Sequence, residues 1–456
     1  MKRFFLLLII SLAWVNVFCE VQSTIPVVKL QYSALSSDTF SLGYFAFIND
    51  SDTLSMPMGV RHRGVSSRRF QKKSYAIKLY DENGQKKDTS LFGMRSDNYW
   101  ILDAMAVDKA RMRNRVAMDL WMDFSAKPYY QSLEPKLCNG YNGKFVEVYV
   151  NDAYEGIYCL MERIDRKQLK LKKVKDNTIN GVLYKAVNWQ GSFFGLLFPY
   201  DNESLTWMRY EYKYPDVEDS LINWTPLYDA MDFTNTATTE EFVSEAPARF
   251  DIPVFMDYYL FTALLSARDN CGRNLYLSYY NINENSKLLI TPWDIDHSWG
   301  RTWTSEEEVP DTESTFDKNP FLRFKDEIPN YYSQLLARYA ALRENFFSLD
   351  SLKQRFTDYF DLFARTHADE RETERWNNID NIALDFSYEE DYIHSWLEQR
   401  LVYTDSLFHY EDIGLEIKNN DSPTPFQKLL LDGRIYIRRG EKVYTLEGRE
   451  VSFNSE

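Results

Sequence analysis

The spacing at which apolar side chains recur changes along this chain, and this change limits the folds that the chain can adopt. Residues 25–47 and 144–161 are strand-like, with stretches that alternate apolar and polar side chains as half-buried strands do. Residues 239–267 and 319–409 instead carry apolar side chains at helical spacing. This pattern predicts an α+β chain, rich in strands in its first part and mostly helical in its second.

Three local patterns place individual elements. Residues 144–163 alternate on both sides of Asn151-Asp152, which predicts a β-hairpin that turns at these two residues. Residues 108–124 form an amphipathic helical pattern in which Asp108 is placed to cap the first turn. Two further strands, at 274–280 and 287–290, bracket a polar loop.

The first residues have the pattern of a secretory signal. Met1-Lys2-Arg3 precedes an apolar run from residue 4 to residue 18, too short to span a membrane comfortably. We expect residues 1–19 to be removed and the protein to be exported to the periplasm, the cell surface or the medium. A lipid anchor at Cys19 is the alternative, and bulky Phe18 disfavours it. No second apolar run of this kind follows, so we expect no transmembrane segment after signal removal.

Charge and cysteine content narrow the classes of partner. The 53 Lys and Arg against 68 Asp and Glu give a net charge of −15, so we expect no nucleic-acid partner, because such binding needs clustered cations. Cys138, Cys159 and Cys271 remain after the signal. Their spacing matches no zinc site. Two states remain possible for them: one disulfide bridge with one free thiol, or three buried thiols.

One segment carries a recognisable chemical pattern. Arg268-Asp269 is followed, five residues after the aspartate, by Asn274. This is the R-D-x-x-x-x-N spacing of a phosphotransfer loop, in which the Asp orients the attacking hydroxyl and the Asn helps to hold a metal ion. The His that usually precedes the Arg is absent, since residue 267 is Ala.

A second acidic pattern follows about twenty residues later. Asp294 and Asp296 come directly after a predicted strand, in the order in which kinases place their metal-holding D-F-G. We expect a strand to deliver both carboxylates to the same side of the chain, because side chains on a strand repeat every two residues. Together with Asn274 they would offer oxygen ligands suited to Mg²⁺ or Mn²⁺ with nucleotide phosphates.

The N-terminal part contributes candidates for binding phosphate. Tyr75-Ala76-Ile77-Lys78 resembles the V-A-I-K strand, whose Lys contacts phosphates. Before it, the loop Arg63–Ser67 offers Gly64, the hydroxyls of Ser66 and Ser67, and the Arg63 guanidinium. Each pattern alone is weak, and their order along the chain favours a phosphotransferase.

The sequence resembles the CotH-type (spore coat protein H) family of atypical protein kinases over residues 25–410. The matching motifs are Arg63–Ser67 with Phe70, Lys72–Tyr75 with Lys78, Leu91–Met94 with Trp100–Leu102, Asp108-Lys109 with Arg113-Asn114, Phe145–Tyr149, Gly156–Tyr158 with Glu162, Asp269-Asn270 with Asn274, and Pro292–Asp296 with Ser298–Gly300.

This resemblance implies a divergent two-lobed kinase fold, with a β-rich N-lobe of about residues 25–185 and a mostly helical C-lobe of about 186–410. It also implies transfer of the ATP γ-phosphate to Ser/Thr hydroxyls of a protein. Asp269 would be catalytic, and Asn274, Asp296 and Asp294 would hold the metal, with Asp296 in the D-F-G role.

The same resemblance assigns the remaining nucleotide contacts. Lys78 would touch the α/β-phosphates beneath the Arg63–Ser67 loop, and Glu162 would lie near the adenine. Arg113 would be either structural or phosphate-facing. The single glycine in the loop departs from ordinary kinases.

The tail, residues 422–456, has the pattern of a small β-hairpin behind a linker, Ser422-Pro423-Thr424-Pro425. It resembles short C-terminal sorting modules of exported Bacteroidetes proteins, and a hairpin that simply packs on the domain is the alternative. Two other functions also stay open: a catalytically silent surface protein, and AMP transfer from the same site.

Overall fold

The computed structural model describes residues 24–35, 38–50, 52–188, 194, 197–216, 221–313 and 318–411, and four strands between 426 and 451. The chain forms two compact units, residues 1–404 and 405–456. The predicted signal, residues 1–19, and the predicted linker at 422–425 lie outside the described residues. The first unit mixes sheets and helices, so the chain is α+β, as its sequence predicts.

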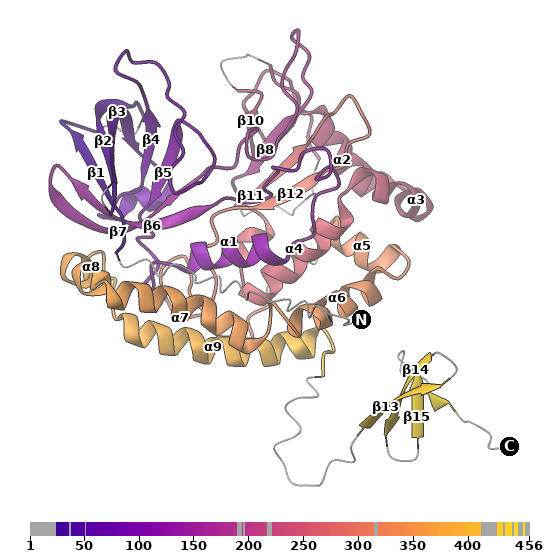
Figure 1. Ribbon diagram of the computed structural model, residues 1–456. Coiled ribbons are helices and arrows are strands. Elements are labelled where there is room, and N and C mark those ends of the chain that lie inside the picture. Colours follow the sequence, from indigo (N-terminus) through magenta and orange to yellow (C-terminus); the bar gives the residue numbers. More distant parts are fainter. Residues whose placement is uncertain are drawn as a thin grey trace, which may run out of the picture. The chain divides into compact units, whose positions relative to one another are not determined.

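A closed β-barrel forms the N-terminal part of the first unit (Figure 1). Its strand order is β1-β2-β3-β4-β5-β7-β6, and the parallel pairing of β1 with β6 closes it. The strands are β1 (Val27–Tyr32), β2 (Ser41–Asn49), β3 (Asp52–His62), β4 (Tyr75–Leu79), β5 (Tyr99–Asp103), β6 (Gly143–Val150) and β7 (Ala153–Met161).

Apolar side chains, which alternate with more exposed ones along the strands, fill the barrel. Val28 and Leu30 are fully buried while Lys29 between them is only partly buried, as a two-residue repeat requires. Trp100 and Leu102 of β5 enter the same core. The predicted hairpin is confirmed: β6 and β7 pair antiparallel around Asn151-Asp152.

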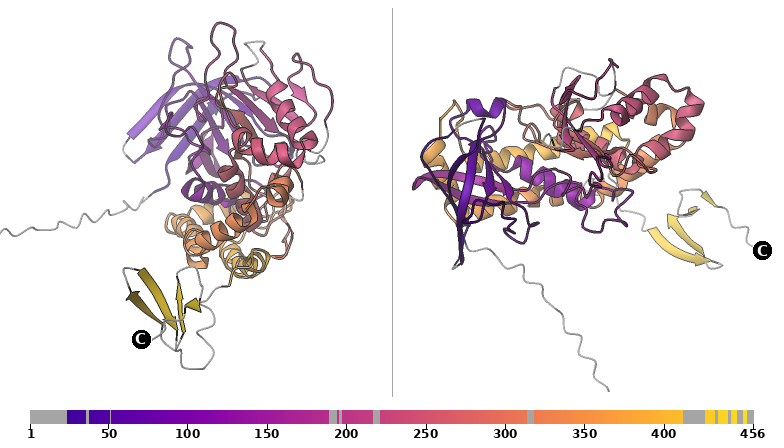
Figure 2. Two further views of the ribbon diagram at one scale, coloured as in Figure 1. Left: turned by 90° about the vertical axis from the view of Figure 1, so that its right-hand side faces the viewer. Right: turned by 90° about the horizontal axis from the view of Figure 1, so that it is seen from above.

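A second sheet lies beside the barrel (Figures 1 and 2). Its strand order is β12-β11-β8-β10-β9. The strands are β8 (Val182–Ala186), β9 (Thr206–Trp207), β10 (Tyr210–Tyr214), β11 (Leu275–Tyr279) and β12 (Leu289–Pro292). The sequence predicted β11 and β12 but missed β8, which pairs with β11 along its whole length.

Helices form a layer against both sheets (Figure 1). They are α1 (Arg113–Phe124), α2 (Thr225–Thr236), α3 (Thr239–Arg249), α4 (Ile252–Leu265), α5 (Phe321–Glu327), α6 (Tyr331–Arg343), α7 (Leu349–Arg365), α8 (Ala368–Trp376) and α9 (Phe386–Leu407). α1 begins five residues after Asp108, yet the Asp108 carboxylate still accepts the N–H groups of Met112 and Arg113 at 2.8 and 2.7 Å.

A buried ion cluster fastens helix α8 to the barrel. The carboxylate of Glu372 on α8 accepts Lys72 Nζ at 2.6 Å, Arg111 Nε at 2.7 Å and the N–H of Ile157 at 2.7 Å. Glu372 is fully buried, so two cations and a backbone donor compensate one desolvated charge. Gly156 leaves room for the carboxylate, because a Cβ there would lie 2.1 Å from Glu372 Oε2.

The second unit is described by its strands alone. β13 (Phe426–Leu431), β14 (Arg434–Arg439), β15 (Lys442–Thr445) and β16 (Glu450–Val451) pair in sequence order as an antiparallel sheet. Throughout the described ranges, no helix has both the length and the apolar character needed to cross a membrane.

Gly156→Ala tests the cluster at α8. The new methyl group collides with the Glu372 carboxylate, so we expect the free energy of unfolding to fall by about 3–5 kcal/mol, as when a buried ion pair is broken. Gly84→Ala is the matched control: Gly84 also has a positive φ, 75°, but nothing lies within 4 Å of its Cβ position. Backbone strain alone costs about 1–2 kcal/mol there. Chemical denaturation measures both variants. If Gly156→Ala and Gly84→Ala lowered the free energy of unfolding equally, this account of Gly156 would be contradicted.

Candidate functional site

A cavity of about 730 Å³ opens between the barrel and the second sheet. Its walls come from the β3–β4 loop, the end of β5, strands β8 and β10, the segment after α4 and the turn after β12. Seven of the catalytic, phosphate-binding and metal-binding residues that the sequence predicts line it: Arg63, Gly64, Ser67, Asp269, Asn274, Asp294 and Asp296. Segments more than two hundred residues apart in the chain therefore meet at one opening.

The loop after β3 forms one wall of this cavity. Gly64 has φ 94°, and a Cβ there would lie 1.8 Å from Ser67 Oγ, so the turn needs glycine. Ser66–Arg69 then form the short 3₁₀ helix η1. The Arg63 guanidinium lies over the Trp293 ring, 5.7 Å from its centroid, which brings its charge beside the acidic turn after β12.

Asp269 lies on η3 (Arg268–Cys271), the short 3₁₀ helix that follows α4. Its carboxylate pairs with the Arg273 guanidinium, and His297 Nδ1 is 3.6 Å from its Oδ1. Burial alone would raise the pKa of Asp269, but His297 and Arg273 bring it below its ordinary value. Asp269 is therefore an anion at neutral pH, able to orient a hydroxyl.

His297 is held between two carboxylates. Its Nδ1 faces Asp269, and its Nε2 is 3.8 Å from Glu308 Oε1. Burial lowers the pKa of His297, but the two acids outweigh this effect and raise it to about 9. The ring therefore carries a positive charge that helps to hold Asp269 ionised.

Asn274 directly precedes β11 and has a left-handed backbone conformation, with φ 55°. Its Nδ2 donates to the carbonyl of Asp294 at 3.2 Å, so its side-chain oxygen is the atom left for a cation. Fully buried Asn270 supports this arrangement, since its Nδ2 donates to the carbonyls of Asn274 and Trp293 at 2.8 and 2.9 Å.

The acidic pair after β12 is not on a strand, contrary to the sequence-based expectation. β12 ends at Pro292, and Asp294 is left-handed with φ 53°. Burial and Asp103 raise the pKa of Asp294, while Lys185 and Arg63 oppose the rise. Burial, Asp294 and Asp103 raise the pKa of Asp296 well above its ordinary range. A turn therefore brings both carboxylates to the cavity, where they repel one another.

Two residues of the cavity were missed in the sequence. Asp103, at the end of β5, adds another carboxylate beside Asp294 and Asp296. Lys185 on β8 is a partly buried cation whose pKa is lowered by burial, although Asp294 opposes this effect. A signal for Lys185 exists in the sequence: Val182–Ala186 is an apolar segment with a lysine as its fourth residue, like Tyr75–Leu79.

Two predicted nucleotide contacts, Lys78 and Glu162, are not among the residues that line the cavity. The Lys78 ammonium is over the Phe40 and Tyr99 rings, 4.5 and 5.8 Å from their centroids. Glu162 is buried just after β7, where its carboxylate accepts the N–H groups of Arg95 and Asn142 and the Gln168 amide. Of the two strand lysines, Lys185 is the one that reaches the acidic turn.

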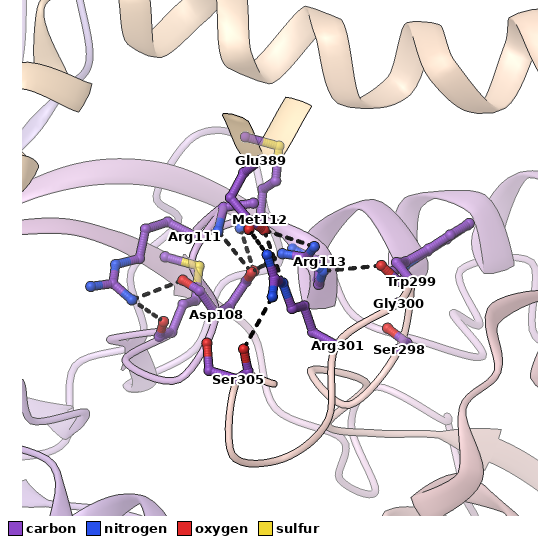
Figure 3. Close-up of polar contacts among 12 residues, drawn as sticks. Asp108, Arg111, Met112, Arg113, Ser298, Trp299, Gly300, Arg301, Ser305 and Glu389 are labelled. Carbon is purple, nitrogen blue, oxygen red and sulfur yellow. Dashed lines mark hydrogen bonds and ion pairs between the residues drawn. The ribbon is translucent and has the colours of Figure 1, made fainter. Parts of the chain in front are cut away.

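Arg113 belongs to a buried polar network (Figure 3). Its guanidinium pairs with Asp108 at 2.6 Å and Glu389 at 2.9 Å, and its Nε is 3.4 Å from the carbonyl of Trp299. Arg301 pairs with the same Glu389 carboxylate. Arg113 is fully buried and does not line the cavity, so of the two roles open to it, the geometry fits the structural one.

The donor set suits a divalent cation that also binds phosphate. Among the described residues, no three His, Cys, Asp or Glu side chains converge closely enough to hold a metal ion by themselves. Mg²⁺ in nucleotide sites takes one or two carboxylates and completes its shell with phosphate oxygens and water. Asp294, Asp296 and the Asn274 oxygen fit this role, and the mutual repulsion of the carboxylates favours a bound cation.

The cavity lining also includes many cations, although the chain as a whole is acidic. Besides Arg63 and Lys185, the lining includes Arg61, Arg68, Arg69, Arg163, Arg166, Lys167, Lys213 and Arg273. Several of these pair with acids, as Arg273 does with Asp269. A cavity that combines carboxylates with many cations matches a polyanion bound together with a metal ion.

Comparison with known proteins gives a family-level match. A family model described as CotH kinase protein matches residues 60–404. The chain is also similar to the inner spore coat protein H of Bacillus subtilis (strain 168), with 26% identity over 258 residues. That alignment covers 56% of this chain and 62% of the relative, less than two thirds of its length.

Asp296→Asn tests the repulsion between the carboxylates. Because the folded-state pKa of Asp296 is raised, its ionisation destabilises the fold as pH rises above the unfolded value of about 4. In chelator at pH 7 we expect the variant to melt at a higher temperature than the parent, and the gain to vanish near pH 4. Thermal melts across this pH range check it. A variant less stable than the parent at pH 7 would show that Asp296 is not under repulsion.

Proposed function

Because this chain belongs to the CotH kinase protein family, we propose that it transfers the γ-phosphate of ATP to Ser or Thr hydroxyls of a protein. The observation that carries the proposal is the shared cavity. Asp269, Asn274, Asp294 and Asp296 line one opening together with Lys185 and the Arg63–Ser67 loop. A protein that served only as a scaffold would have no need to hold repelling carboxylates at an open cavity.

The architecture fits a divergent two-lobed kinase. In this proposal the barrel and its β3–β4 loop form the nucleotide-covering lobe, and the helical layer carries the catalytic loop. The sheet β12-β11-β8-β10-β9 joins the two, because β8 supplies Lys185 while β11 and β12 frame the acidic turn.

Lys185 takes the phosphate role that the sequence assigned to Lys78. It lies beside Asp294 and near Arg63, so a triphosphate there would meet cations as well as the metal. The glycine turn at Gly64 lets backbone N–H groups of η1 approach the same phosphates. One glycine would thus serve where ordinary kinases use several.

Asp269 orients the acceptor. In the proposed step the acceptor oxygen attacks the γ-phosphorus, the bond from that phosphorus to the β–γ bridging oxygen breaks, and ADP leaves. The hydroxyl proton passes to Asp269 or to solvent. A lowered pKa makes Asp269 a weak base, which suits a loose transition state in which the proton moves late.

A divalent cation, Mg²⁺ or Mn²⁺, held by Asp294, Asp296 and the Asn274 oxygen would neutralise charge on the transferred group. Export through the N-terminal signal remains part of the proposal, and it would place the acceptor outside the cytoplasm. The acceptor is expected to be a protein and not a nucleic acid, given the net charge of −15.

Label transfer tests the activity. Residues 20–456 are incubated with γ-labelled ATP, Mn²⁺ and a Ser-rich protein, and we expect labelling of the chain itself or of that protein. Asp269→Asn should slow transfer by about 10²–10⁴-fold while nucleotide still binds. Label from α-labelled ATP would indicate AMP transfer instead, and no nucleotide binding at all would favour a silent surface protein.

Lys185→Met and Lys78→Met separate the two lysine assignments. Loss of a charge-assisted contact worth about 1.5–3 kcal/mol should weaken Mn²⁺–ATP binding by about 10- to 100-fold in the Lys185 variant. The Lys78 variant should bind much as the parent does, since its ammonium lies on aromatic rings. Calorimetric titration measures both, and the reverse order would restore the sequence-based assignment.

A further inference from the structure

The motif Arg113-Asn114 begins helix α1, and Asn114 lies where the barrel meets the acidic turn. Its side chain is 5% exposed and reaches the cavity lining. Asn114 Nδ2 donates to Asp103 Oδ2 at 3.2 Å, and its Oδ1 accepts the N–H of Ile295 at 3.1 Å. Ile295 is the residue between Asp294 and Asp296. The Asn114 amide therefore contacts both Asp103 and the turn that carries the other two carboxylates.

The contacts of Asp103 and Asn114 connect three separate motifs. Ser74 Oγ donates to Asp103 Oδ1 at 3.2 Å and accepts the N–H of Ala104 at 2.9 Å. The Tyr141 hydroxyl donates to Asn114 Oδ1 at 2.8 Å, which fixes the orientation of the amide. The segment before β4, helix α1 and the turn after β12 therefore meet at a single bridge.

Helix α1 contacts the turn region a second time. Arg113, the preceding residue, places its Nε 3.4 Å from the carbonyl of Trp299 (Figure 3). Helix α1 thus contacts residues 294–299 at two points, and of these two contacts the one made by Asn114 lies beside the carboxylates. Arg113 is further held by Asp108 and Glu389.

We propose that Asn114 is a positioning residue, which holds the Asp294–Asp296 turn against Asp103 so that the carboxylates face one cation–nucleotide site. This inference rests on the proposed function. Asp103, Asp294 and Asp296 repel one another, and a neutral amide can join them because it donates to a carboxylate and accepts a backbone N–H at once. An aspartate at position 114 would lose the donor and add a further negative charge.

Calorimetric titration with Mn²⁺ alone and then with Mn²⁺–ATP tests the role without an activity assay. Asn114→Ala should weaken binding by about 10- to 100-fold, as loss of a residue that orients metal ligands does. Asn139→Ala is the matched control: Asn139 is also buried beside the second sheet, but it bonds Ile290 and Thr291 instead of the acidic turn. It should lose stability and keep its affinity.

A swap of the two partners gives a rescue test. Asn114→Asp alone should weaken binding, and adding Asp103→Asn restores one amide and one carboxylate in reversed places, so affinity should recover. Parent-like affinity in Asn114→Ala, or no recovery in the swap, would overturn the positioning role. A parent chain that binds neither Mn²⁺ nor ATP would instead reject the proposed function, and the inference with it.

Discussion

Mutual repulsion between carboxylates is the constraint on which the site depends. Asp103, Asp269, Asp294 and Asp296 reach one cavity, where Asp103 and Asp269 help to raise the pKa values of Asp294 and Asp296, and Asp294 adds to the rise at Asp296. Such a cluster costs stability unless the surrounding chain holds it and a cation neutralises it. Much of the structure around the cavity can be understood as meeting this requirement.

Buried polar contacts hold the parts of the first unit in place. Glu372 joins α8 to Lys72 and Arg111, while Glu389 of α9 joins Arg113 and Arg301. Both carboxylates are buried and each has two cationic partners, so their desolvation is compensated. These two clusters set the helical layer against the barrel and the turn region.

Local patterns in the sequence predict a large part of this arrangement. The hairpin of β6 and β7, strands β11 and β12, and most helices follow from the repeat of apolar residues and from turn residues. The R-D-x-x-x-x-N spacing and the acidic pair lead to residues that do share a cavity. The hairpin of β11 and β12 brings these residues together, and the sequence can predict it because its two strands are close in the chain.

Contacts between distant segments are where sequence reasoning fails. Lys78 and Lys185 are each the fourth residue of a five-residue apolar strand, and the pairing of β8 with β11 places Lys185 at the cavity. Asp103 gives no local signal beyond following an apolar strand. Arginine is a common phosphate ligand, yet Asp108 and Glu389 occupy the guanidinium of Arg113. No spacing in the sequence indicates Glu389 as its partner, because the two residues are 276 positions apart.

A crystal structure with Mn²⁺ and a non-hydrolysable ATP analogue tests the central claim most directly, since the anomalous signal locates the metal. We expect a manganese peak at Asp294, Asp296 and the Asn274 oxygen, with phosphates between Lys185 and the Arg63–Ser67 loop and the γ-phosphate facing Asp269. A nucleotide bound at Lys78, or a metal ion bound away from the acidic turn, would contradict the account.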